Sequence, residues 1–142
     1  MRVLGMLSGT SHDGIDLAVV DFDRVGEDGL RGSLVWTGEV PYSAATRRLL
    51  VEALPPARTT MEAVCRLDVS VGREFASAAA GAIAAAGPVE VICSHGQTVY
   101  HGVEDGAVWG TLQIGQPAWI AEETGIPVIA DVRTRDVAAG GQ

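Results

Sequence analysis

Residues Met6–Asp16 read MLSGTSHDGID, a loop rich in glycine, hydroxyl and carboxylate groups. Apolar runs flank it at Val3–Leu7 and Ile15–Phe22, and both runs favour strands over helices. The segment is therefore predicted to form a β-hairpin, from which the fold of the chain starts. Gly9 and Gly14 are expected to adopt backbone angles closed to other residues, so that successive N–H groups converge on an anion. An ordinary hairpin turn is the alternative interpretation of the same residues.

The carboxylates of this loop indicate a divalent cation. Asp13 and Asp16 lie beside the expected phosphate cradle, where they would repel a bound phosphate. A Mg²⁺ ion placed between the carboxylates and a nucleotide would remove that repulsion. Ser8, Thr10 and Ser11 add hydroxyl donors, so the loop as a whole predicts Mg²⁺ together with a nucleotide.

Composition limits the class of protein. The 142 residues are 47% hydrophobic and 20% charged, which is enough for one core of ordinary size. The net charge of −8 argues against duplex nucleic acid or an anionic membrane as a partner. Cys65 and Cys93 lie outside any C-x-x-C spacing, and the amino terminus lacks the apolar run of a secretory leader. We therefore expect reduced thiols in the core of a cytoplasmic protein.

The order of the remaining segments predicts an α/β protein, in which a β-meander is followed by alternating helices and strands. Pro41 places the third strand at a sheet edge or at a strand end. The expected elements after the hairpin are a strand at Ser33–Tyr42, a helix at Ser43–Leu54, a helix ending at Gly87-Pro88, strands at Val89–Cys93 and Trp109–Ile114, a helix at Gln116–Thr124 and a strand at Ile126–Asp131.

The long central helix has the clearest pattern. Thr59 and Glu62 match a capping box with Thr59 at the N-cap. Apolar residues then recur every three or four positions and predict one buried face. These residues are Val64, Leu67, Val71, Phe75, Ala78 and Ala82.

A second polar cluster, SHGQTVYH at Ser94–His101, follows the strand predicted at Val89–Cys93. Polar side chains at the carboxyl end of a buried strand point into the crevice beside the sheet, where Ser, His, Gln and Thr suit the hydroxyl and amide groups of a sugar. Gly96 would permit a close approach. Taken alone, His95 is more simply interpreted as a neutral imidazole that is hydrogen-bonded within a turn.

Two other interpretations of these residues have little support. His12, His95 and His101 could ligate zinc by residue type, but their spacing matches no familiar metal site. A catalytic triad of Ser11, His12 and Asp13 fails because adjacent hairpin residues cannot align their functional groups.

The third cluster is Ala130–Gln142, which reads ADVRTRDVAAGGQ. Arg133 and Arg135 follow a predicted strand, and a guanidinium binds carboxylate or phosphate oxygens through two parallel hydrogen bonds. A surface ion pair with Asp131 or Asp136 is the alternative.

Together the motifs resemble one family. They are GMLSGTSHDGID at Gly5–Asp16, SHGQTVYH at Ser94–His101, TLQIGQP at Thr111–Pro117 and ADVRTRDVAAGGQ at Ala130–Gln142. In this order they resemble the anhydro-N-acetylmuramic acid kinases. His12 stands where a leucine is expected most often, and Val132 stands where an aromatic residue is expected.

The resemblance implies the N-terminal domain of an actin-like, ribonuclease H-like ATPase, built around a mixed sheet. Members of this family use ATP and water to open 1,6-anhydro-N-acetylmuramic acid while phosphorylating O6, which gives N-acetylmuramic acid 6-phosphate in peptidoglycan recycling. Residues 1–142 would then be an incomplete N-terminal domain without the second domain. The resemblance places the general base, an aspartate, beyond Gln142, so we expect the fragment to be inactive alone.

The resemblance also assigns residues. The ATP loop would comprise Gly9, Thr10, Ser11, His12, Asp13, Gly14, Ile15 and Asp16, with Asp13 and Asp16 near Mg²⁺. The sugar would contact Ser94, His95, Gln97, Thr98 and Arg135, and Arg135 would bind the lactyl carboxylate. The implied partners are the sugar and ATP, without nucleic acid or membrane and with a homodimer left open. A binding or assembly module of the actin-like fold without a sugar site, and a sugar kinase of other specificity, remain the alternatives.

Overall fold

A computed structural model describes residues 1–25 and 29–142. The chain begins with an antiparallel meander of β1 (Arg2–Ser8), β2 (Gly14–Val25) and β3 (Gly29–Pro41). The predicted hairpin around residues 9–13 is therefore confirmed, and Pro41 lies at a strand end as expected. The remaining elements are α1 (Ala44–Ala53), α2 (Met61–Ala86), β4 (Val91–Glu104), β5 (Ala107–Ile114), α3 (Pro117–Thr124), β6 (Val128–Ile129) and α4 (Val132–Ala138).

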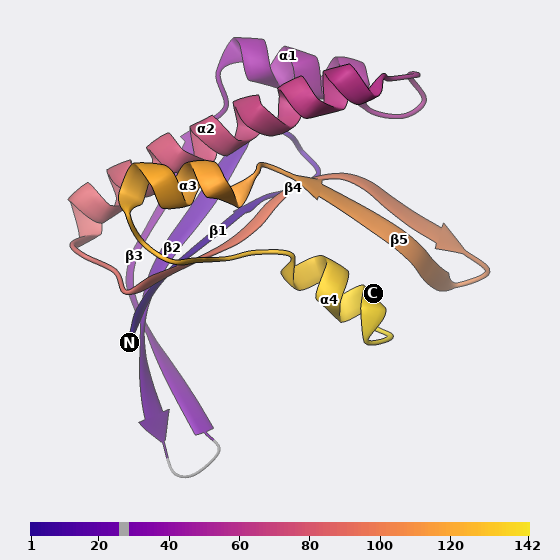
Figure 1. Ribbon diagram of the computed structural model, residues 1–142. Helices are drawn as coiled ribbons and strands as arrows, with labels where there is room; N and C mark the ends of the chain where they lie inside the picture. Colours follow the sequence, from indigo (N-terminus) through magenta and orange to yellow (C-terminus); the bar gives the residue numbers. More distant parts are fainter. Residues whose placement is uncertain (26–28) are drawn as a thin grey trace.

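The strands form one mixed sheet in the order β3-β2-β1-β4-β5, and β6 pairs with β4 (Figure 1). Strand β4 runs parallel to β1 and to β6 but antiparallel to β5. The predicted α/β class, with a meander followed by alternating helices and strands around a mixed sheet, is confirmed.

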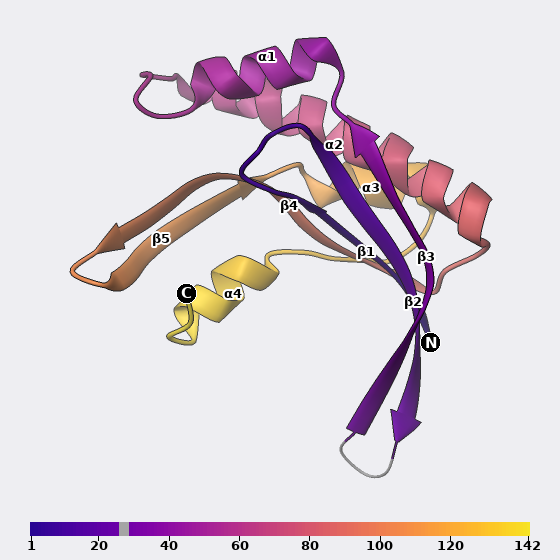
Figure 2. The same cartoon turned by 180° about the vertical axis from the view of Figure 1, so that it is seen from behind.

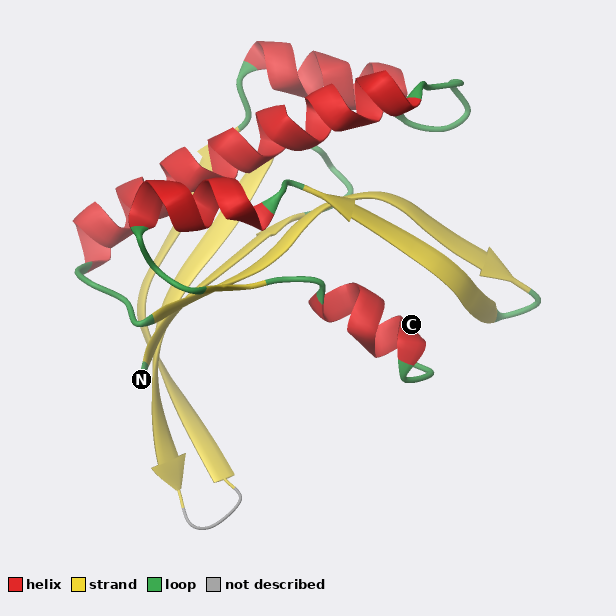
Figure 3. Cartoon of the chain, in the orientation of Figure 1, coloured by secondary structure: helices red, strands yellow, loops and turns green. Residues whose placement is uncertain are grey.

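Helices α1, α2 and α3 gather on one face of the sheet, whereas α4 lies on the other side of β4 (Figures 2 and 3). The core fills the space between the sheet and α2. The predicted apolar face of α2 is confirmed, since Leu67, Val71 and Phe75 are buried against the strands. The opposite sheet face carries exposed apolar side chains, including Leu34 and Ile129.

The helix caps follow the sequence with one correction. Ser43 caps α1 by accepting a hydrogen bond from the N–H of Thr46. Thr60, not Thr59, is the N-cap of α2, and its hydroxyl accepts from the N–H of Ala63 at 3.1 Å. Glu62 therefore occupies the second helical position, where it pairs with Arg66 one turn later instead of closing a capping box.

Strand β4 differs most from the prediction. We expected a strand that ended at Cys93 with a polar cluster after it, but the strand continues through the whole cluster to Glu104. It pairs with β1 up to Gln97 and with β5 from Gln97 onward. The segment stays extended because each half finds a partner strand, which the local sequence does not reveal.

Two smaller expectations are wrong. Cys65 is exposed on α2, and Cys93 is half-buried, so only Cys93 approaches the core. The last strand comprises two residues, and Ile129 is 54% exposed because its side of the sheet lies away from α2 and α3. No helix within the described ranges is both long and apolar enough to span a membrane.

Candidate functional site

The loop at residues 9–13 joins β1 to β2 in a tight turn. The N–H of His12 donates to the carbonyl of Gly9 at 3.3 Å, and the N–H of Tyr42 donates to the carbonyl of Asp13 at 3.0 Å. The left-handed residue is His12, with φ 54°, whereas neither Gly9 nor Gly14 has a positive φ. Our expectation that these glycines supply unusual backbone angles is therefore wrong.

Gly14 is required for a different reason. A Cβ atom at this position would lie 2.8 Å from the carbonyl oxygen of Val40 on β3. At Gly9, by contrast, a Cβ would meet nothing closer than the Ser11 hydroxyl at 3.9 Å. The backbone at Gly9 thus has open space beside it that a ligand group could use.

Asp13 is held as a carboxylate at the surface of the loop. The Ser11 hydroxyl donates to Asp13 Oδ1 at 2.5 Å, and this hydrogen bond lowers the pKa of Asp13 below its ordinary range. Asp16 is exposed on β2. Among residues 1–25 and 29–142, no three His, Cys, Asp or Glu side chains gather as a metal cage. Two carboxylates fit Mg²⁺, which usually takes one or two protein carboxylates and completes its shell with phosphate and water.

A cavity of about 170 Å³ opens beside the junction of β4 and β5. Asp68 on α2 forms one wall, and its carboxylate accepts from the N–H of Gly115 at 2.7 Å. The lining residues are Asp68, Ser94, His95, Gly96, Gln113, Ile114, Gly115, Gln116, Pro117, Ala130 and Asp131. The cavity therefore draws its walls from α2, from β4 with β5, and from the segments that flank α3 and precede α4.

Three buried polar atoms around this cavity lack a hydrogen-bond partner in the described structure. They are Ser94 Oγ, His95 Nε2 and Gln113 Oε1. His95 Nδ1 lies 3.3 Å from the carbonyl of Gly96, so this contact is a hydrogen bond only when Nδ1 carries the proton. The neutral ring then presents Nε2 as an acceptor. Two acceptors and one hydroxyl are thus available to a ligand that offers hydroxyl groups.

Gln113 is a residue that the sequence analysis missed. Its side-chain N–H groups donate to Thr111 Oγ1 at 2.7 Å and to Thr98 Oγ1 at 3.2 Å. These two bonds fix the amide so that Oε1 stays free. Alternation along β5 could have indicated the residue, because Thr111 and Gln113 share one face of the strand.

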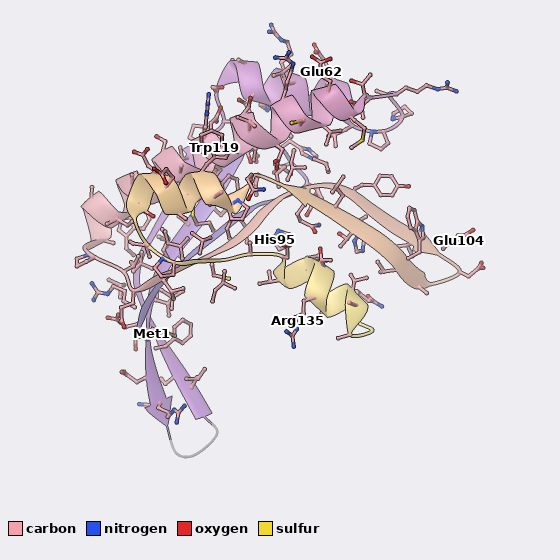
Figure 4. All side chains as sticks on the ribbon, viewed as in Figure 1. Met1, Glu62, His95, Glu104, Trp119 and Arg135 are labelled. Atoms are coloured by element: carbon pink, nitrogen blue, oxygen red, sulfur yellow. The ribbon has the colours of Figure 1, made fainter. Side chains whose placement is uncertain are left out.

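The structure brings only some of the predicted sugar residues together. Ser94 and His95 line the cavity, whereas Thr98 reaches it only through Gln113. Gln97 is fully buried, and its amide faces the loop at residues 9–14 instead. Arg135 is exposed on α4 and lies on the other side of that helix from His95 in Figure 4. Its role toward a substrate carboxylate stays a prediction.

Gly96 permits a close approach of strand β5, and the expected approach of a ligand at this residue stays a prediction. Its φ is +75°, and a Cβ would lie 2.6 Å from the carbonyl oxygen of Ile114 on β5. Any side chain here would push β5 away from β4.

Known proteins of one family are similar to this chain. A family model described as anhydro-N-acetylmuramic acid kinase matches residues 1–142. The anhydro-N-acetylmuramic acid kinase of Streptomyces avermitilis is 52% identical over 100% of the chain and 37% of the relative. That of Caldanaerobacter subterraneus subsp. tengcongensis is 43% identical over 99% of the chain and 37% of the relative. The chain thus spans about 37% of the length of these relatives.

A solved structure, that of Thermus thermophilus RuvC, aligns with 18% identity and a TM-score of 0.43 over 92% of this chain and 60% of that chain. The family model matches every residue of the chain, which includes both the glycine-containing loop and the residues that line the β4–β5 cavity. The chain belongs to the anhydro-N-acetylmuramic acid kinase family.

Proposed function

We propose that this chain forms the sugar-binding wall and the phosphate loop of an ATP-dependent anhydro-N-acetylmuramic acid kinase. The observation that carries the proposal is the set of unpaired buried atoms Ser94 Oγ, His95 Nε2 and Gln113 Oε1. A buried polar atom without a partner costs about 1–3 kcal/mol, which a correctly placed ligand would recover. A sugar with several hydroxyl groups supplies the donors that two of these atoms lack.

The loop supports nucleotide binding in the same reaction. Asp13 is ionised and exposed, Asp16 follows on β2, and the backbone at Gly9 has room beside it. When bound, Mg²⁺ would neutralise the charge of the ATP phosphates and favour phosphoryl transfer. Asp13 and Asp16 would hold that ion, while Thr10 and Ser11 would offer hydroxyls to the phosphates.

The proposed reaction consumes ATP and water. The γ-phosphoryl group moves to O6 of the sugar, the bond between C1 and O6 breaks, and the water oxygen becomes bonded to C1. The products are ADP and N-acetylmuramic acid 6-phosphate, in keeping with a cytoplasmic role in peptidoglycan recycling. Residues beyond this chain would supply the general base and the second wall of the cleft, because phosphoryl transfer needs groups on both sides.

A hybrid kinase tests the proposal. In the hybrid, residues 1–142 of this chain replace the matching part of the Streptomyces avermitilis relative, and the rest of the relative is kept. ADP release is measured with 1,6-anhydro-N-acetylmuramic acid as the substrate, and the mass of the product is determined by mass spectrometry. We expect a mass gain of one phosphate and one water, and we expect no turnover from residues 1–142 alone.

Two results would contradict the proposal. A product that carries phosphate without the added water would indicate a sugar kinase of another specificity. ADP release that does not depend on the sugar, combined with unchanged kinetics in the Ser94→Ala variant, would show that the cavity does not bind the substrate. Light scattering of the hybrid would determine separately whether it forms the homodimer that the sequence analysis left open.

A further inference from the structure

Gln97 lies at the point where three strands meet. It pairs with Ser8 on β1 and with Ile114 on β5, and its side chain is completely buried. The preceding residues, Ser94 to Gly96, line the cavity. The Gln97 side chain points toward the loop at residues 9–14 instead, so one short stretch of β4 touches both candidate ligand sites.

Both polar atoms of the Gln97 side chain face partners within the protein. Its Nε2 donates to the carbonyl of Gly9 at 3.0 Å and to the carbonyl of Thr98 at 3.0 Å. Its Oε1 lies 2.7 Å from Ser8 Oγ, which also lies 2.6 Å from the carbonyl of Gly14. Rotating the amide by half a turn would place its oxygen against two carbonyl oxygens, so the network fixes one orientation.

A β-bulge connects this network to the cavity. Met6 pairs with Ser94 and Ser8 pairs with Gln97, so His95 and Gly96 together stand opposite Leu7 alone. Bulges redirect the side chains around them. Movement of His95 or Gly96 toward a ligand would therefore shift Gln97, which holds the loop at both of its ends.

We infer that Gln97 is a positioning residue that couples occupancy of the cavity to the geometry of the loop at residues 9–14. This inference rests on the proposed function for the identity of the two ligands. It replaces the role in direct sugar contact that the family resemblance implied for Gln97. Coupling between two sites is reciprocal, so sugar should tighten nucleotide binding by the factor by which nucleotide tightens sugar binding.

The test uses the hybrid kinase and two variants of similar side-chain size. Gln97→Met removes every hydrogen bond of the amide, and Gln97→Glu removes the two donors and keeps an acceptor. Calorimetry measures the affinity of a non-hydrolysable ATP analogue with Mg²⁺, in the absence and presence of the anhydro sugar. We expect the sugar to tighten nucleotide binding about 5-fold or more in the parent protein and less than about 2-fold in both variants.

Sugar affinity without nucleotide distinguishes positioning from direct contact. Because Gln97 does not line the cavity, both variants should bind the sugar alone within about 3-fold of the parent. A loss of about 10-fold or more would instead show that Gln97 contacts the sugar and would overturn the inference.

A control and a second readout separate the remaining explanations. Thr60→Ala removes the cap of α2, whose hydrogen bond is to Ala63 and not to the loop, so its coupling factor should match that of the parent. Amide hydrogen exchange of residues 9–14 should quicken about 10-fold in Gln97→Met and stay unchanged in Thr60→Ala. This exchange readout needs no sugar, so it decides the positioning role even if the hybrid fails to bind the anhydro sugar and the proposed function falls. Unchanged exchange in the Gln97 variants would overturn the inference, and so would a parent protein that binds both ligands without coupling between them.

Discussion

The two polar clusters of this chain use their hydrogen-bonding groups in opposite ways. Around the loop at residues 9–14, Ser8 and Gln97 direct their polar groups toward each other and toward backbone carbonyls. Around the cavity, Ser94 and Gln113 keep buried oxygen atoms without partners. The first cluster therefore contributes to stability before any ligand arrives, whereas the second lowers stability until a ligand pairs with it.

Gly96 joins the two clusters, so replacing it should have the largest effect. Gly96→Ala should lower the free energy of unfolding of the hybrid kinase by about 2–4 kcal/mol, because φ is +75° and the new Cβ would meet the Ile114 carbonyl. Urea denaturation followed by circular dichroism measures this loss. Gly110→Ala is the matched control, since a Cβ there has no neighbour within 4 Å. Equal losses in the two variants would show that the tight contact at Gly96 is unimportant.

Replacing serine by alanine should change the free energy of unfolding in opposite directions in the two clusters. The larger change is expected at Ser8, beside the loop. Ser8→Ala removes the hydroxyl whose single proton can be donated either to Gln97 Oε1 or to the Gly14 carbonyl. We expect the free energy of unfolding to fall by about 1–3 kcal/mol. Ser33→Ala, at an exposed position on β3, should change it by less than about 0.5 kcal/mol in the same urea experiment. A Ser8→Ala protein as stable as its parent would mean that the loop network does not hold the fold.

In the cavity, Ser94→Ala removes a buried hydroxyl that has no partner. The free energy of unfolding should rise by up to about 1 kcal/mol, while the affinity for the anhydro sugar should fall about 10-fold as a ligand hydrogen bond is lost. Urea denaturation and calorimetry on the same sample measure both changes. If stability and affinity fell together, Ser94 would have a structural role and the contrast with Ser8 would disappear.

The smallest expected effect concerns the pKa of Asp13. The Ser11 hydrogen bond lowers this pKa, so its contribution to stability is present above about pH 4 and is lost as the pH falls through the lowered value. Ser11→Ala should raise the pKa of Asp13 toward its ordinary value, as measured by NMR titration of the carboxyl carbon. Thr10→Ala keeps the hydrogen bond between Ser11 and Asp13 and should leave that pKa in place. An identical titration in the Ser11 and Thr10 variants would contradict the assigned cause.

Local patterns in the sequence predicted the hairpin and the buried face of α2 because each depends on neighbouring residues. The N-cap was displaced by one position, since Thr59 and Thr60 have equal capping chemistry and only the helix geometry selects Thr60. The spacing of Thr59 and Glu62 predicted a capping box, but the Glu62 carboxylate instead accepts hydrogen bonds from Arg66 one turn along the helix.

Features that depend on strands distant in the sequence could not be predicted from such local patterns. The continuation of β4 through SHGQTV requires β1 as a partner up to Gln97 and β5 from Gln97 onward, and composition alone favours a loop there. Ser94 and His95 were predicted at the site from their residue types, whereas the hydrogen bonds of Gln97 to Ser8 and Gly9 were not predicted. The orientation of its amide depends on Gly9, which lies 88 positions away in the sequence.

That separation has a consequence for how the chain acquires its shape during synthesis. Strands β1, β2 and β3 are consecutive, so they can pair soon after they leave the ribosome. Pairing of β4 with β1 closes the long segment between them, and this closure costs chain entropy before the contacts between the two strands form. The hairpin of the nascent protein can therefore form well before Gln97 is synthesised and can hydrogen-bond to it. The loop at residues 9–14 therefore gains its hydrogen bond from Gln97 only after β4 has been synthesised.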